Sequence, residues 1–278
     1  MVLDSHGSFH DYKRKTLQML KRYTHLKAES GEADGVRRRI KEEGLRKMKQ
    51  NQSNELNMIG ALSEKYSGHP VLQSLLSLIP GWTAADNMLL WRANEIKMER
   101  INVFFEEIAN GHCELTRDLI DNNDFLHSYF CAVRAASNCR NAEKIKQFAR
   151  LFLSPHIPDL QVTPDEQEDL LSILEQTTVR EFAALNNLYQ HECLNRRSAH
   201  ENELQHTMKY WGKFKADIIS TIGIPGGSFN SFMARLERTG LYIRFTGTYL
   251  DYSGDIGRTT TVFSRLLDVV KAHNDDAN

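Results

Sequence analysis

The densest group of side chains that could bind a metal ion consists of three histidines and one cysteine, at His191, Cys193, His200 and His206. Imidazole and thiolate are ligands that zinc prefers. However, His200 and His206 are six positions apart, so they fall on different faces of one helix, and the chain contains neither an HExxH nor a CxxC motif. We therefore expect no metal and no cofactor, and we interpret these residues as ordinary surface and boundary positions.

A second arrangement with chemical potential is Arg150 followed by His156. Histidine titrates near neutral pH and arginine binds phosphate, and the spacing is similar to that in helical ribonucleases of prokaryotic defence. Pro155 places the pair at the end of a helix, and the chain has 11 histidines, so a chance match is the favoured interpretation. The two residues remain the only catalytic candidates of a chain that we expect not to be an enzyme.

Two further motifs are better explained by structure than by chemistry. The run GIPGGS at 223–228 resembles a phosphate-binding glycine loop, but it lacks the Lys-Ser/Thr ending of a P-loop and no clear strand precedes it. We expect a tight turn between helices. Asp86, Glu95 and Lys97 imitate the residue set of some metal-dependent nucleases, which carry it on strands. Here the three residues lie in a predicted helix.

Polar and basic residues near the C-terminus could contact nucleic acid. The candidates lie on a short predicted helix and on or beside a predicted hairpin: Asn230, Ser231, Arg235, Arg238, Arg244 and Arg258. Residues 196–278 hold 11 Lys or Arg against 9 Asp or Glu, whereas a DNA-binding domain usually presents a concentrated basic surface. The balance favours a protein-binding or purely structural role over DNA binding.

Hydrophobic spacing predicts helices over most of the chain. An apolar stripe at spacings of three and four covers residues 9–29, and further helices follow from Pro70, from Thr83 to Gly111, from Asp124 as N-cap, from Asn141 as N-cap and from Thr163-Pro164. We expect Thr177-Thr178 to divide the last of these. The boundaries predict a basic, partly mobile helical arm (1–60), a helical domain (61–153), a Pro-rich linker (154–165), connecting helices (166–195) and a C-terminal domain (196–278).

The C-terminal domain differs in pattern from the rest. A helix ending near Ile222 is followed by the glycine turn, a short helix capped by Ser228, strand-forming runs at 241–245 and 248–252, and a helix over 261–270. Helix, turn, helix and a two-stranded wing in that order are typical of a winged helix. The predicted fold class is mainly α, with a multi-helix N-terminal and central body and a C-terminal winged-helix-like α+β domain.

Three runs together resemble bacterial abortive-infection proteins of the Abi-alpha type and their relatives. They are LIPGWTAADNMLL at 78–90, EKIKQFARLFL at 143–153 and LERTGLYI at 236–243. The resemblance rests on core and turn residues and implies a role in phage defence or host regulation. It carries over no catalytic residue, and the basic N-terminal arm lies outside it.

Composition limits the remaining classes of function. The formal net charge of the 278 residues is -1, so no global field draws the chain to nucleic acid or anionic membrane, although residues 1–60 hold 13 Lys or Arg against 8 Asp or Glu. Four scattered cysteines and a polar N-terminus favour a cytoplasmic protein with reduced thiols, and the most apolar segment is interrupted too often to cross a bilayer.

The leading hypothesis from the sequence is a non-enzymatic phage-defence or regulatory protein that acts through contacts with a protein partner or a second copy of itself. A winged-helix DNA-binding regulator is the first alternative, and a helical ribonuclease is the second. No small-molecule substrate is identified.

Overall fold

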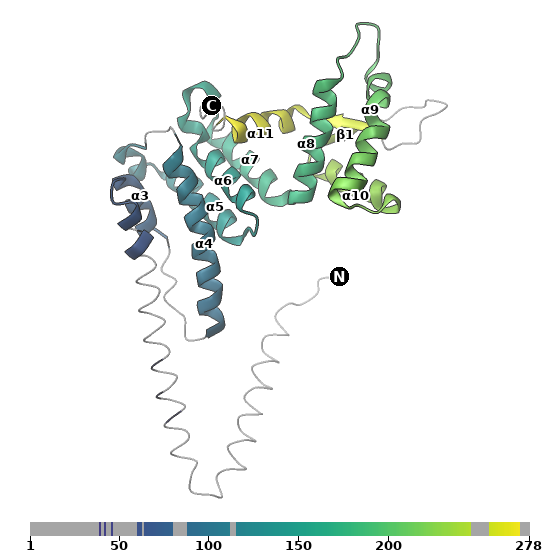
Figure 1. Ribbon diagram of the computed structural model, residues 1–278. Coiled ribbons are helices and arrows are strands. Elements are labelled where there is room, and N and C mark those ends of the chain that lie inside the picture. Colours follow the sequence, from purple (N-terminus) through teal and green to yellow (C-terminus); the bar gives the residue numbers. More distant parts are fainter. Residues whose placement is uncertain are drawn as a thin grey trace, which may run out of the picture. The chain divides into compact units, whose positions relative to one another are not determined.

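The computed structural model describes the chain at residues 39, 42, 46, 60–62, 64–79, 88–111, 115–245 and 256–272, with the backbone alone at 88–94 (Figure 1). The chain divides into two units, Met1–Gly60 with Trp82–Ala93, and Ala61–Gly81 with Asn94–Asn278. Of the predicted N-terminal arm, Arg39, Glu42 and Arg46 are described, and they are helical and exposed. The predicted helix at 9–29 lies outside the described residues.

The second unit is mainly helical. Its first part contains α3 (Pro70–Ser77), α4 (Met88–Asn110, in this unit from Asn94 onward), the 3₁₀ turn η2 (Arg117–Asp121), α5 (Asn123–Asn138), α6 (Ala142–Leu153), η3 (Ser154–His156), η4 (Pro158–Leu160), α7 (Pro164–Gln176) and α8 (Val179–Leu194). Several of these helices begin where the sequence predicts. Pro70 is in the first turn of α3, and Asn141, Thr163 and Thr178 cap α6, α7 and α8 with their side chains.

The start of α5 differs from the prediction by two residues. The predicted N-cap was Asp124, but the cap is Asn122, whose side chain accepts hydrogen bonds from the amides of Asp124 (2.8 Å) and Phe125 (3.2 Å). Both residue types favour the N-cap position, so sequence alone does not choose between them. Asp124 instead lies in the first turn, where its negative charge is favourable to the helix dipole.

Aromatic side chains form the core between α4, α5 and α6. Phe104, Phe105, Tyr129 and Phe152 are almost completely buried, and their ring centroids lie about 6 Å apart in tilted or edge-to-face pairs. The hydroxyl of Tyr129 donates a 2.6 Å hydrogen bond to the carbonyl of Leu75, so the buried phenol attaches α5 to α3.

The Pro-rich segment after α6 is closely packed. It forms the 3₁₀ turns η3 and η4, and Ser154 and Val162 are buried. The side-chain amide of Gln167, on α7, donates to the carbonyls of Leu151 (2.9 Å) and Phe152 (2.8 Å). The Leu151 carbonyl also accepts from the amide and the hydroxyl of Ser154, and together these bonds satisfy the carbonyls at the end of α6. A short, hydrogen-bonded connection therefore joins α6 and α7.

The C-terminal part combines helices with a small sheet. It contains α9 (Glu203–Asp217), a π-helical turn η5 (Ile218–Ile222), η6 (Gly226–Ser228), α10 (Phe229–Arg238), β1 (Tyr242–Arg244), β2 (Gly257–Thr259) and α11 (Thr261–Lys271). Gly223 ends the helical run with a φ of 67°, in the left-handed region that favours glycine. The GIPGGS run is thus a turn between helices, as the sequence predicts.

A strand that the sequence analysis does not predict, β2, pairs with β1. β1 and β2 pair antiparallel, with Tyr242 opposite Thr259 and Arg244 opposite Gly257. The predicted strand at 248–252 lies outside the described residues. Gly257 has a physical reason to be glycine, because an added Cβ would come within 2.3 Å of the Ile243 carbonyl and of the Tyr242 ring.

The last helix connects the sheet to the central helices. α11 leaves β2 and packs against α6, as Figure 1 shows. The Arg265 guanidinium, on α11, binds the Glu166 carboxylate at 2.7 Å and 3.1 Å and the Leu160 carbonyl at 2.8 Å. The C-terminal elements are therefore attached to the helical body through α11 as well as through α8.

No helix in the described part of the chain combines the length and the apolar character that a membrane-crossing helix requires.

Candidate functional site

The short helix α10 carries four of the six predicted nucleic-acid candidates on its outer face, and Arg244 and Arg258 lie on β1 and β2. Phe229, Phe232, Met233 and Leu236 are buried, while Asn230, Ser231, Arg235 and Arg238 are exposed. The sequence predicts a cap at Ser228, but its side chain makes no capping hydrogen bond, because η6 leads directly into α10. The apolar face thus fixes the helix, and its polar face is available for contact.

Arg235 is paired with a buried carboxylate of the same chain. Its Nε and Nη2 donate to Oε1 of Glu181, at 3.0 Å and 2.7 Å. Glu181 is in the first turn of α8, and its other oxygen accepts from the amide of Thr178, which completes a capping box. Burial opposes ionisation of Glu181, but the hydrogen bonds from Thr178 and Arg235 outweigh it, so the pKa of this carboxyl lies below its usual range.

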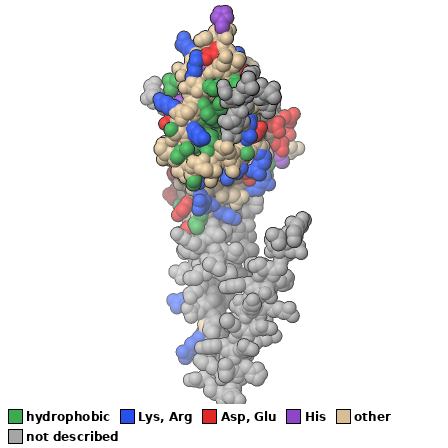
Figure 2. Space-filling view, turned by 90° about the vertical axis from the view of Figure 1, so that its right-hand side faces the viewer, with side chains coloured by type: hydrophobic (Ala, Val, Ile, Leu, Met, Phe, Trp, Pro, Cys, Tyr) green, Lys and Arg blue, Asp and Glu red, His purple; other side chains and the backbone are tan. Residues whose placement is uncertain are grey.

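Two more of the candidate arginines face carboxylates. Nη2 of Arg244 lies 3.3 Å from Oε2 of Glu237, and Nε of Arg258 lies 3.3 Å from Oε2 of Glu203. Figure 2 shows the molecule from the side on which α9 and α10 lie in Figure 1. Basic, acidic and apolar side chains are interspersed over the described residues in this view. The positive charges predicted to form a nucleic-acid surface are therefore largely balanced where they lie.

Arg238 is the exception among the four arginines. It is exposed near the end of α10 and forms no ion pair with any residue that the structure describes. It lies on the same helix as the exposed Asn230 and Ser231. One arginine and two small polar side chains are what remains of the predicted basic surface in the described part of the chain.

The histidines between α8 and α9 have structural partners. Nε2 of His191 lies 2.9 Å from Oδ2 of Asp217, and its ring is stacked parallel to that of Tyr210. His206 bonds the carbonyl of Asn195. In the described part of the chain, no three His, Cys, Asp or Glu side chains are grouped as metal ligands. These histidines join α8 to α9 and to the loop between them.

The glycine turn at 223–227 is held from α8. Nη2 of Arg180 donates to the carbonyls of Ile222 (3.0 Å) and Gly223 (3.1 Å). A guanidinium thus satisfies the last carbonyls of the helical run, a frequent function of basic residues at helix C-termini. At this point the turn presents carbonyl oxygens to a cation, whereas a phosphate-binding loop would present amide groups to an anion.

The two catalytic candidates lie in different surroundings. Arg150 is 6% exposed; its Nε donates to Oε1 of Glu107 at 2.7 Å, and its Nη1 donates to the carbonyl of Val270 at 2.9 Å. The ring of His156 is half-buried and packs edge-to-face on Phe125, and burial lowers the pKa of this histidine. Arg150 is therefore already occupied in joining α4, α6 and α11.

Of the nuclease-like set, two residues are described. Glu95 and Lys97 lie on α4 and are half-buried, while Asp86 lies outside the described residues. A helix does not provide the strand framework of those nucleases, as the sequence analysis expects.

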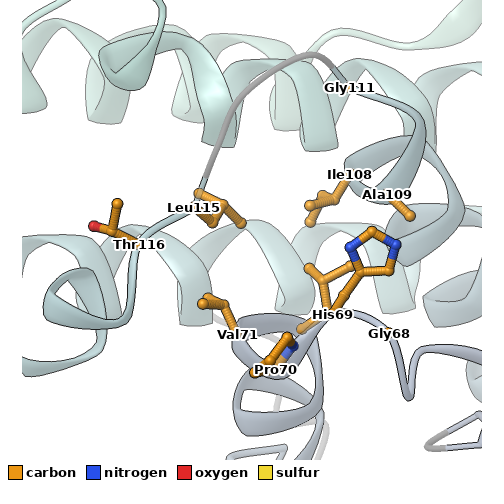
Figure 3. A pocket seen from close by; sticks show the side chains of 10 residues that line it. Gly68, His69, Pro70, Val71, Ile108, Ala109, Gly111, Leu115 and Thr116 are labelled. Carbon is orange, nitrogen blue, oxygen red and sulfur yellow. The ribbon is translucent and has the colours of Figure 1, made fainter.

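A cavity of about 440 Å³ lies between the start of α3 and the end of α4 (Figure 3). Its walls are formed mainly by small and apolar groups, among them Pro70, Val71, Ile108 and Leu115. His69 is the one titratable side chain of its lining. Thr116 is the other polar side chain of the lining, and it forms no hydrogen bond with His69 in the described part of the chain, so the two are not arranged as a catalytic pair.

The sequence does not predict the half-buried carboxyl of Glu192 beside the sheet. Glu192, on α8, accepts hydrogen bonds from the amide and the hydroxyl of Thr259, on β2. Burial raises the pKa of Glu192 and the bonds from Thr259 oppose that effect. Like Glu181, Glu192 is a carboxylate of α8 that positions a later element of the chain. A glutamate on a predicted helix gives no signal of this role in the sequence.

No protein-family model matches the sequence, and neither a curated protein nor a solved structure matches it.

Proposed function

We propose that residues 196–278 form a winged-helix-like module that binds another protein, and that the chain is a non-enzymatic regulator in phage defence. The order α9, α10, β1, β2 and α11 follows the expected order of helix, turn, helix, two-stranded wing and final helix. The segment 246–255, where the tip of a wing would lie, is outside the described residues. The fold assignment and the function are both parts of the proposal.

One observation carries the choice of protein over nucleic acid. Three of the four candidate arginines face carboxylates of their own chain, at Glu181, Glu237 and Glu203. Affinity for DNA comes largely from cations that replace the counterions of the phosphates. An arginine already balanced by a carboxylate contributes little to that exchange, because a phosphate approaching it also meets the negative partner.

Exposed apolar side chains support contact with a protein. Met208, on α9, is 52% exposed, and Ile243, on β1, is 48% exposed. Methionine and large aliphatic groups contribute to the apolar centres of protein interfaces, where charged groups are depleted. A surface that combines balanced charge with exposed apolar groups is better suited to a protein partner or a second copy of the chain than to a polyanion.

The process rests on the resemblance of three sequence runs to abortive-infection proteins. A cytoplasmic location belongs to the same proposal, and it is consistent with the free thiols of Cys131, Cys139 and Cys193. The absence of an assigned catalytic group in the sequence analysis is the reason for proposing a regulator and not an enzyme.

A DNA-binding regulator is the second candidate function. Arg238 has no ion pair with a described residue, and it shares the outer face of α10 with Asn230 and Ser231. Side chains of these types read base edges and phosphates when a helix enters the major groove. This alternative requires Arg238 to be essential, and the protein-binding proposal does not.

Phage plating on a sensitive bacterium tests both the process and the surface. Cells that express the wild-type gene should plate a phage panel less efficiently than cells without it. The double variant Met208→Glu/Ile243→Glu should lose that protection, because a charge at a central apolar contact costs about 2 kcal/mol or more of binding free energy. Both side chains are exposed, so the folded protein should accumulate normally.

The matched control is Lys213→Glu, which alters another exposed residue of α9. It should protect as the wild type does. Unchanged plating with the wild-type gene would refute the defence role. Protection that survives Met208→Glu/Ile243→Glu but is lost in Arg238→Ala would refute the protein-binding surface in favour of DNA binding.

A further inference from the structure

We propose that a hollow formed by the N-terminal ends of α6 and α8 binds a small phosphate-bearing ligand. The hollow has a volume of about 690 Å³, and its lining includes Arg140, Lys144 and Arg180 together with the polar Asn138, Asn141 and Thr178. No carboxylate belongs to the lining. This site, which we call the α6–α8 pocket, is separate from the surface proposed for protein binding.

The three cations of the α6–α8 pocket lack carboxylate partners among the described residues. Nζ of Lys144 donates to two main-chain carbonyls, those of Glu175 (3.1 Å) and Thr177 (2.6 Å). Arg180 donates to the carbonyls of the glycine turn, and Arg140 is exposed and forms neither a hydrogen bond nor an ion pair with a described residue. Solvent or main-chain carbonyl dipoles therefore surround these positive charges, and no carboxylate of the described residues neutralises them.

The contrast with other arginines of the protein is informative. Arg150, Arg235 and Arg265 each have a carboxylate within 3 Å. The carboxylates around the pocket face other cations or form no ion pair with a described residue: Glu181 binds Arg235 and the amide of Thr178, Glu143 faces Lys146 (4.0 Å) and Arg150 (3.7 Å), and Glu175 forms no ion pair with a described residue. A cluster of unbalanced cations that converge on one hollow is an arrangement that a multivalent anion would stabilise.

The state of Lys144 agrees with this interpretation. Burial lowers the pKa of its ammonium group, and only longer-range attraction to Glu175 and Glu181 and to the neighbouring Cys139 opposes that effect. An anion in the pocket would favour the charged form of Lys144. The N-terminal ends of α6 and α8 add a positive electrostatic potential at the pocket. The first amides of each helix have no acceptor within the helix beyond its cap, which is Asn141 in α6 and Thr178 in α8.

The dimensions of the pocket favour a small ligand over a nucleic-acid strand. Pockets of about 300–1,000 Å³ are usual for small ligands. The pocket lining offers no aromatic side chain on which a base could stack. The chemistry that it recognises is thus a phosphate monoester or oligophosphate, either inorganic or as part of a nucleotide.

Isothermal titration calorimetry of the full chain at low salt, with inorganic pyrophosphate and in parallel with adenosine triphosphate, tests this proposal. Both ligands should bind. Arg140→Gln should weaken binding about tenfold, because a hydrogen bond to a charged group contributes at least that factor, and Arg140→Glu should weaken it further. Arg140 is exposed, so the melting temperature without ligand should not change.

Lys213→Gln is the control, because it removes the same charge from an exposed position outside the pocket, and it should bind both ligands as the wild type does. Tighter binding of adenosine triphosphate than of pyrophosphate would identify a nucleotide as the source, and equal binding would identify the phosphate groups alone. Three results would overturn the proposal: no binding at millimolar pyrophosphate, an equal loss in Lys213→Gln, or an Arg140-dependent affinity for duplex DNA above that for either small ligand.

Discussion

Replacing Glu107 with leucine is expected to destabilise the protein by about 3 kcal/mol, since it leaves the buried guanidinium of Arg150 with only the more distant and more exposed carboxylate of Glu143, at 3.7 Å. The two side chains are 13% and 7% exposed, and the ion pair joins α4 to α6 at 2.7 Å. Arg150 would keep the carbonyl of Val270, but a carbonyl dipole does not balance a full charge. Urea denaturation followed by circular dichroism measures the change in the free energy of unfolding.

Two companion variants make this prediction specific. Glu106→Gln removes the neighbouring ion pair with Lys65, whose side chains are 43% and 45% exposed, and should cost about 1 kcal/mol or less. The double variant Glu107→Leu/Arg150→Met removes both buried charges and should recover much of the loss. If Glu106→Gln and Glu107→Leu both changed the free energy of unfolding by the same small amount, the structural role of Arg150 would be contradicted. Arg150 would then again be a catalytic candidate.

Phe229→Ala should have a similar effect, a loss of about 3–5 kcal/mol, because it creates a cavity where α10 joins α9. Phe229 is fully buried; its ring lies 6.2 Å from those of Trp211 and Phe214, and Nζ of Lys215 lies 4.9 Å from its centre. Thermal unfolding monitored by calorimetry checks the prediction.

Asn230→Ala is the matched control, because Asn230 is the next residue of α10 and is exposed. Its effect on stability should lie within about 0.5 kcal/mol. A Phe229→Ala protein that melts like the wild type would mean that α10 does not pack on α9, and the surface proposed for partner binding would lose its framework.

Much of the helical framework follows from local signals in the sequence. Asn141, Thr163 and Thr178 are caps because a short polar side chain there can accept from a free amide, an interaction confined to neighbouring residues. The strand Gly257–Thr259 was missed for the opposite reason. It contains a glycine and no apolar alternation, and only its partner across the hairpin makes it a strand.

The contacts of the candidate site join residues that lie far apart in the sequence, and local sequence patterns do not predict such contacts. Arg235 was named for its charge and position, but its partner Glu181 is 54 residues earlier in the sequence. The capping pattern of Thr178 and Glu181 is readable in the sequence, but it gives no hint that Glu181 also binds α10. The cations of the α6–α8 pocket are similarly divided between two helices, and only the packing of those helices brings them together.

The affinity of the chain for duplex DNA, measured by fluorescence anisotropy over a range of salt concentrations, tests the central claim most directly. Our account predicts no salt-sensitive binding of the wild type at micromolar concentration. We also expect Glu203→Gln/Glu237→Gln, which frees Arg258, Arg197 and Arg244, to gain binding with a log–log salt slope of up to about 3. Micromolar binding by the wild type that weakens steeply with salt and is lost in Arg238→Ala would contradict it.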